Sequence, residues 1–174
     1  LLVLLTVPAF AATNPAVKGN FSVSLPLFSY WTGIGDLDES SYFSFLAVGL
    51  EPDVQYFVMD DLSVGGKVGY ISDENGGVKT KTTLFGPMAN YYFSFIKAPV
   101  LPYAGAGLIY EQNKYDGAKE KTTELRLHGG AVYMLGKHLS AYGEILLSPY
   151  VKYSNGESIS GQKLGISAGI RAFF

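Results

Sequence analysis

Only a few side chains in this 174-residue sequence have types and spacings that suit chemistry. There are two histidines, His128 and His138, and no cysteine, so a thiol nucleophile and a Cys-ligated zinc site are excluded. The sequence contains no His-x-x-His spacing, no EF-hand loop and no suitably spaced acidic cluster. We therefore expect the protein to bind no metal ion and no cofactor.

Charged residues form a second candidate group, because they fall on one face of alternating segments. Four of these charges lie on four different segments, each at a similar distance from the short turn that ends its segment: Glu51, Lys67, Arg126 and Glu144. This placement predicts one shared charge network. Charges inside a narrow interior need partners, since an unpaired buried ion costs several kcal/mol. The plainer alternative is that these charges only fill and neutralise the interior. Further ionisable residues expected on the same face are Asp53, Glu124, His128, Lys163 and Arg171.

Alternation of apolar and polar residues defines the segments that position these charges. Every second residue from Leu164 to Phe174 is apolar, and the residues between them up to Arg171 are small, polar or charged. A strand of this kind separates an apolar environment from a polar one. The same pattern, clear in some segments and noisy in others, predicts eight strands near residues 20–27, 42–58, 62–70, 80–94, 100–112, 124–133, 139–148 and 163–174.

The connections between these strands are expected to alternate in length. Short connections fall near residues 59–61, 96–99 and 136–138, whereas longer polar ones cover 32–41, 72–78, 113–121 and 154–160. In a meander, alternate connections lie at the same end, so one rim has tight turns and the other has loops. The predicted fold class is therefore all-β, an eight-stranded antiparallel up-and-down transmembrane β-barrel.

Aromatic residues gather near the ends of the predicted strands, which favours two belts at the membrane–water interfaces. The alternative is that tyrosine and phenylalanine simply favour strands. The belt beside the short turns would contain Tyr56, Phe57, Tyr91, Tyr92, Phe93, Tyr103, Tyr133 and Tyr142, and the other belt Tyr30, Trp31, Tyr42, Tyr70, Tyr110, Tyr150 and Tyr153.

Composition agrees with a membrane-embedded sheet. Charged residues make up 16% of the chain, below the ~25% usual for soluble domains. The formal net charge is −2, with no basic run, which excludes nucleic acid as the expected partner. Residues 1–11 contain an apolar run ending in Ala9-Phe10-Ala11, which is typical of a signal peptide lacking its start. We expect the barrel domain to cover residues 12–174.

Three strand–turn–strand segments and the C-terminal residues resemble a known family. The segments are YFVMDDLSVGGKVGY (56–70), YYFSFIKAPVLPYAGAGLIY (91–110) and YMLGKHLSAYGEILL (133–147), and the chain ends in GISAGIRAFF. They are similar to the small eight-stranded outer-membrane barrels typified by the transmembrane domain of outer membrane protein A and by outer membrane protein X. The resemblance implies that Phe174 is the C-terminal signal for the barrel-assembly machinery. It also implies that the internal charges form a network linked to gating of a small pore.

The first functional hypothesis is a non-enzymatic outer-membrane barrel with a structural role in the envelope and weak, gated pore activity. Its expected partners are outer-membrane lipid, lipopolysaccharide and, during biogenesis, the assembly machinery. The alternative is a surface adhesion protein whose extracellular loops bind an unknown partner. A lipid A-modifying enzyme ranks last, because Gly130 occupies the serine position of a deacylase-like His-x-Ser motif. We expect His128 to be structural and to pair with Glu144 or Glu124.

Overall fold

A computed structural model describes residues 14–34, 41–45, 49–75, 78–95, 100–115, 118–154 and 158–174. These residues form one antiparallel sheet and no helix. In particular, no helix among them is long and apolar enough to cross a membrane. The predicted signal peptide, residues 1–11, lies outside the described ranges and stays a prediction.

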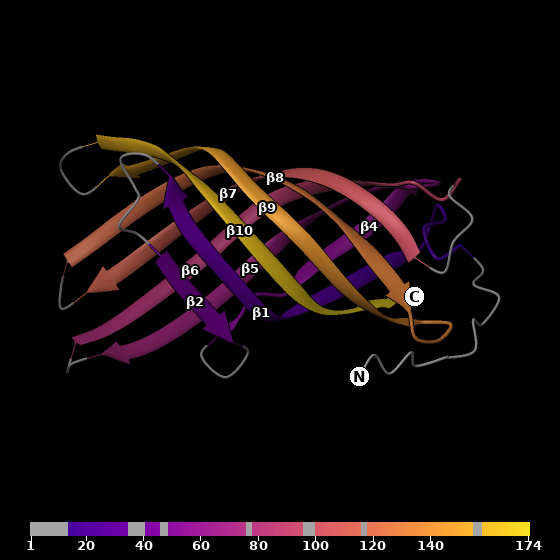
Figure 1. Ribbon diagram of the computed structural model, residues 1–174, viewed down its shortest axis with the longest axis horizontal. Coiled ribbons are helices and arrows are strands. Elements are labelled where there is room, and N and C mark those ends of the chain that lie inside the picture. The colour runs from indigo at the N-terminus through magenta and orange to yellow at the C-terminus, as the bar shows by residue number, and fades with distance from the viewer. Residues whose placement is uncertain are drawn as a thin grey trace, which may run out of the picture.

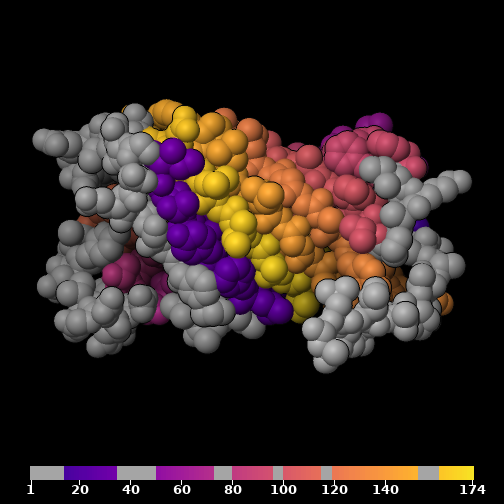
Figure 2. Space-filling model, viewed as in Figure 1, coloured from indigo at the N-terminus to yellow at the C-terminus, as the bar shows by residue number. Residues whose placement is uncertain are grey.

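The sheet closes on itself into a barrel, because β1 pairs with β10 at one side and with β2 and β4 at the other. Figure 2 shows this seam, where the indigo stripe of β1 runs beside the yellow stripe of β10. The strands are tilted and follow one another around the wall (Figure 1). They are β1 (Phe21–Ile34), β2 (Ser41–Phe45), β3 (Gly49–Leu50), β4 (Asp53–Met59), β5 (Leu62–Asn75), β6 (Val78–Tyr92), β7 (Val100–Tyr115), β8 (Ala118–Met134), β9 (Leu139–Ser154) and β10 (Ser158–Phe173).

The second strand of the wall is divided into three pieces. β2 pairs with β1, β3 pairs with β5, and β4 pairs with both, so the three together fill one position. The predicted eight-stranded antiparallel barrel is therefore confirmed. Pro52 lies directly before β4 and has no N–H to donate to a neighbouring strand, which explains one of the breaks.

Apolar side chains cover the outside of the wall, as the alternation predicts. On β10, Leu164, Ile166 and Ile170 are exposed on the outer surface, whereas Lys163 and Arg171 are buried inside. Because side chains alternate strictly along a strand, this arrangement places small and charged residues in the interior, which we call the lumen.

The predicted alternation of short and long connections is wrong. β5 continues to Asn75 and β6 begins at Val78, while β7 continues to Tyr115 and β8 begins at Ala118. Most of the two expected loops is therefore strand, which suits the threonines of residues 78–83. At the opposite end, β6 and β7 are separated by residues 93–99, of which 96–99 lie outside the described ranges. Connection length does not distinguish the two rims.

The predicted aromatic belts are correct only in part. Tyr56 and Tyr91 are exposed outside, but their partners in the predicted belt, Phe57, Tyr92, Tyr103 and Tyr142, are buried inside, and so is Trp31. Neighbouring residues on a strand face opposite sides, so Tyr91 and Tyr92 cannot belong to the same belt. The side chains of Tyr42 and Tyr153 lie outside the described part.

The residues before β1 fold across one opening of the barrel. Gly19 N donates to the Phe57 carbonyl at 2.9 Å, and Asp61 N donates to the Ala16 carbonyl at 2.8 Å. Gly19 has φ 94°, a left-handed conformation that favours glycine. Ala16 is fully buried by these contacts. Residues 14–20 therefore close the end of the barrel that holds the turn between β4 and β5.

Arginine at Ile166 should destabilise the barrel in lipid by roughly 2–4 kcal/mol, because Ile166 lies in the middle of the outer apolar band. Arginine at Gln162, exposed near the far end of the same strand, should cost about 0–1 kcal/mol. Urea unfolding of the two variants in lipid vesicles measures both costs. Equal costs would contradict the assignment of the lipid-facing band.

Candidate functional site

Five aromatic side chains pack inside the barrel at the end closed by residues 14–20, and we call them the aromatic plug. Ala16 and Val132 complete the cluster, so apolar atoms fill the lumen at this level. The ring centroids of neighbouring members lie 5.4–6.5 Å apart, which is the usual range for packed aromatic pairs. The plug consists of Phe57, Tyr92, Tyr103, Tyr142 and Phe173.

Arg171 is held against the plug by hydrogen bonds and ring faces. Its Nη1 donates to the Tyr92 hydroxyl at 2.5 Å, and its Nε donates to Ser24 Oγ at 2.6 Å. The guanidinium carbon lies 4.8 Å from the ring centroid of Tyr103 and 5.1 Å from that of Tyr142. Cation–π attraction strengthens when the cation is desolvated, as it is here. Arg171 therefore anchors the plug to the wall.

A histidine and a glutamate occupy the lumen close to the plug. His128 Nε2 lies 2.5 Å from Asn90 Oδ1, a carbonyl acceptor, so Nε2 donates. The partner of His128 is thus an amide, and the expectation of Glu144 or Glu124 is wrong. A Cβ at residue 105 would collide with His128 Nε2, so glycine at this position leaves room for the pair. Glu144 instead accepts a hydrogen bond from the Tyr103 hydroxyl at 2.8 Å.

Arg126 makes the second contact between a cation and a ring. Its guanidinium carbon lies 4.5 Å from the Trp31 ring centroid, and its Nε donates to Glu124 Oε1 at 2.7 Å. Ser148 Oγ donates to the same carboxylate oxygen at 2.6 Å. A Cβ at residue 165 would lie 2.7 Å from the Trp31 ring, so Gly165 on the neighbouring strand is required for this packing.

A second ion pair lies on the opposite part of the wall. Lys67 Nζ is 2.9 Å from Glu51 Oε2, and both side chains are almost completely buried. Glu51 also interacts electrostatically with Arg126 and Glu124, so the two ion pairs lie within electrostatic range of each other. Both ion pairs lie in the lumen.

The structure thus brings some predicted network residues together and leaves others apart. Glu51 pairs with Lys67, whereas Arg126 pairs with Glu124, which was expected only as an additional charge. Glu144 contacts Tyr103 and no predicted network residue. Asp53 and Lys163 are buried in the lumen, as expected. Phe174 lies outside, where its ring stacks on Phe21 at 5.0 Å.

Several residues that hold the charges were missed by sequence reasoning. Tyr92 and Tyr103 were assigned to an outer belt, although alternation from the inward polar Asn90 places Tyr92 inside. Trp31 carries no such signal, because a register shift between Pro26 and Phe28 reverses the alternation along β1.

The described side chains of the lumen make ion pairs, hydrogen bonds and ring contacts. The described residues contain no group of three histidine, cysteine or acidic side chains that could hold a metal. His128 contacts the Asn90 amide and the edge of Tyr103, at 6.1 Å between ring centroids. The arrangement neutralises buried charge and fills space.

Replacing Arg126 with glutamine should cost about 3–5 kcal/mol of unfolding free energy, because Glu124 would be left buried without its ion-pair partner. Adding Glu124→Gln should recover part of that loss. A double-mutant cycle from urea unfolding in lipid vesicles, followed by gel mobility, measures the coupling.

The matched control cycle combines Arg126→Gln with Glu144→Gln. Glu144 lies opposite Gly130, which is four residues, or about 13 Å, along β8 from Arg126, so these two effects should add. Additivity in the Arg126–Glu124 cycle as well would mean that the ion pair makes no coupled contribution.

Solved structures with a similar fold include three bacterial proteins. The N-terminal β-barrel domain of Pseudomonas aeruginosa OprF is 15% identical, with a TM-score of 0.59, and the match covers 90% of this chain and 98% of that one. Neisserial surface protein A is 18% identical, with a TM-score of 0.58, covering 89% and 97%. Pseudomonas aeruginosa OprG is 13% identical, with a TM-score of 0.60, covering 93% and 99%. At these identities the likeness shows the fold alone.

No curated protein matches the chain in sequence. The family described as outer membrane protein beta-barrel domain does match, over residues 1–171. Together with the closed antiparallel wall and its apolar outer face, this match points to the bacterial outer membrane. The chain therefore belongs to the outer membrane protein β-barrel family.

Proposed function

We propose that this protein is a structural barrel of the outer membrane whose lumen is closed to ions. The observation that supports this proposal is the aromatic plug, whose members are almost completely buried and fill the lumen at one end. An eight-stranded wall encloses a space just wide enough for side chains to fill. A continuous water path would require the plug to move.

The charged part of the lumen supports the same proposal. Glu51–Lys67 and Arg126–Glu124 are paired within hydrogen-bonding distance, and the Trp31 ring covers the Arg126 guanidinium. Pores that conduct ions keep charged side chains hydrated, whereas these four charged side chains are almost completely buried. We accordingly assign the charges to stability and not to gating.

Two other roles have less support. A lipid-modifying enzyme would need its catalytic groups where lipid can reach them, but His128 is buried in the lumen. A surface-binding role would use the hairpins of β5 to β8, which extend past the outer aromatic residues Phe85 and Tyr110. The tips of these hairpins, residues 76–77 and 116–117, lie outside the described part, so a loop-binding partner stays a prediction.

The wild-type barrel should show no steady conductance in a planar lipid bilayer, because the plug blocks the lumen. The variant Tyr92→Ala/Tyr103→Ala removes two stacked rings of the plug and should open a measurable conductance. If the double variant does not fold, Tyr103→Ala alone replaces it, because the single substitution leaves a smaller cavity. Loss of the gel-mobility shift on boiling shows that a variant has not folded.

The control is Tyr91→Ala/Tyr110→Ala, which removes the same residue types from the outer surface of the same two strands. This variant should stay non-conducting. Steady wild-type conductance equal to that of the plug variant would show that the lumen is open and would refute the proposal.

A further inference from the structure

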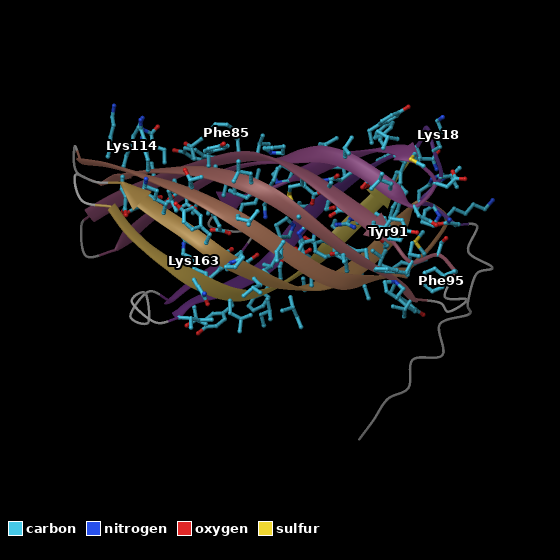
Figure 3. The ribbon with its side chains drawn as sticks, turned by 90° about the horizontal axis from the view of Figure 1, so that it is seen from above. Lys18, Phe85, Tyr91, Phe95, Lys114 and Lys163 are labelled. Carbon is cyan, nitrogen blue, oxygen red and sulfur yellow. The ribbon has the colours of Figure 1, made fainter. Side chains whose placement is uncertain are left out.

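Residues 14–20 form a separate element at the closed end of the barrel, and we call this element the lid. Two of its side chains, those of Pro15 and Ala16, are buried, whereas the rest of the lid is exposed or partly exposed. Figure 3 shows Lys18 at the same end of the barrel as Phe95. The lid therefore buries little apolar surface of its own.

Asp61, in the turn between β4 and β5, joins the lid to the wall. Its N–H donates to the Ala16 carbonyl at 2.8 Å, and its carboxylate accepts a hydrogen bond from Asn14 Nδ2 at 3.3 Å. On the wall side, its carbonyl accepts from Tyr92 N at 2.8 Å, and its carboxylate accepts from Ser94 Oγ at 2.7 Å. Asp61 has φ 67°, a left-handed conformation that aspartate tolerates better than most residues. Asp61 thus links the lid to the end of β6.

Further hydrogen bonds attach the rest of the lid. Lys18 N donates to Asp60 Oδ1 at 2.8 Å, in the same turn. Gly19 N donates to the Phe57 carbonyl, and Phe57 N donates to the Asn20 carbonyl, each at 2.9 Å. This last pair of bonds extends the pairing of β1 with β4 toward the lid.

These contacts predict that the lid opens more easily than the wall. Segments with few buried apolar contacts and exposed hydrogen bonds open locally, at a lower free energy than the core of the structure. The bonds from the lid to the carboxylates of Asp60 and Asp61 are both exposed, so water can replace them. The wall is held differently, since β7 pairs with β8 along its whole length, from Val100 to Tyr115.

The lid covers the aromatic plug through Ala16. This side chain is fully buried and belongs to the same cluster as the five plug residues and Val132. Departure of the lid would bring this side of the plug into contact with water. The lumen therefore has two closures in series, the lid outside and the plug inside.

We propose that residues 14–20 are a lid that opens and closes while the barrel stays folded, and that the turn containing Asp60 and Asp61 is its latch. Opening exposes the outer side of the plug to water, whereas the lumen stays closed because the plug is retained. The inference concerns a motion of the lid and does not depend on whether the wild-type barrel conducts.

The test uses the full chain folded in phosphatidylcholine nanodiscs, which leave both ends of the barrel in water, with the substitution Ala16→Cys. The chain contains no cysteine, so a maleimide reagent reacts at this position alone. When opening and closing are faster than labelling, the labelling rate measures the open population. The gel-mobility shift on boiling shows in the same samples that the barrel is folded. If Ala16→Cys does not fold, Pro15→Cys replaces it.

The variant Gly19→Ala weakens the closed lid through its backbone alone. Gly19 has φ 94°, where alanine is strained, and an added Cβ would have no described heavy atom within 4 Å beyond its neighbours in the chain. The matched control is Gly136→Ala in the turn between β8 and β9, at the same end of the barrel. An added Cβ there has the same free space, and Gly136 has no positive φ.

The variant Asp61→Gly tests the latch. Glycine keeps the left-handed backbone but removes the carboxylate that binds Asn14. Its control is Asp61→Asn, because asparagine also tolerates this conformation and keeps an acceptor oxygen.

We expect labelling to be slow without these substitutions and about 10-fold faster with either Gly19→Ala or Asp61→Gly, because each weakens only the closed lid. The mobility shift should be unchanged. Gly136→Ala should leave the labelling rate as it is, and Asp61→Asn should keep it within about twofold.

Three results would overturn the proposal. Equal labelling rates in the two test variants and their controls would mean that neither the lid backbone nor the latch controls access to Ala16. Labelling confined to samples that have lost the mobility shift would mean that the lid unfolds only together with the wall. Labelling of the folded barrel as fast as that of boiled protein would mean that the lid does not close. A conducting wild-type barrel would contradict the closed lumen but would leave these labelling rates unchanged.

Discussion

A closed wall of eight strands fixes the volume of its interior, and every inward side chain must fit and be satisfied within that volume. Alternation sends every second residue inside, so the inward set includes charges as well as small residues. An unpaired charge there would destabilise the barrel by several kcal/mol. The arrangement of the lumen follows from this constraint, with rings at one end and paired charges at mid-height.

Aromatic rings stabilise the buried arginines both at the closed end of the lumen and at mid-height. Arg171 lies among three tyrosines of the plug, and Arg126 lies over Trp31. In each case the ring supplies apolar volume, while its face attracts the cation. The arginines can therefore be buried with few carboxylates nearby. Glycines such as Gly165 make this possible, since a Cβ there would collide with the tryptophan ring.

The lipid-facing surface of the barrel could be predicted from sequence, whereas many side-chain contacts of the lumen could not. Alternation identified the barrel and the lipid-facing side of β10, because lipid imposes a uniform apolar requirement on that face. Lumen contacts depend on which strands lie opposite each other across the barrel. The Arg126–Trp31 contact is an example, since it requires both barrel closure and the irregular register in β1. Likewise, nothing in the local sequence distinguishes Asn90 from Glu144 as the partner of His128.

Trp31 is the single tryptophan of the chain, so its fluorescence reports the environment of the lumen directly. The decisive measurement is quenching of this fluorescence in lipid vesicles, by brominated lipid from the membrane and by iodide from water. Because Trp31 is buried inside beneath the Arg126 guanidinium, both quenchers should have little effect on the folded barrel, and iodide should quench after unfolding in urea. Strong iodide quenching of the folded protein would show a water-filled lumen, and strong quenching by brominated lipid would place Trp31 on the outer surface. Either result would contradict a closed, side-chain-filled barrel.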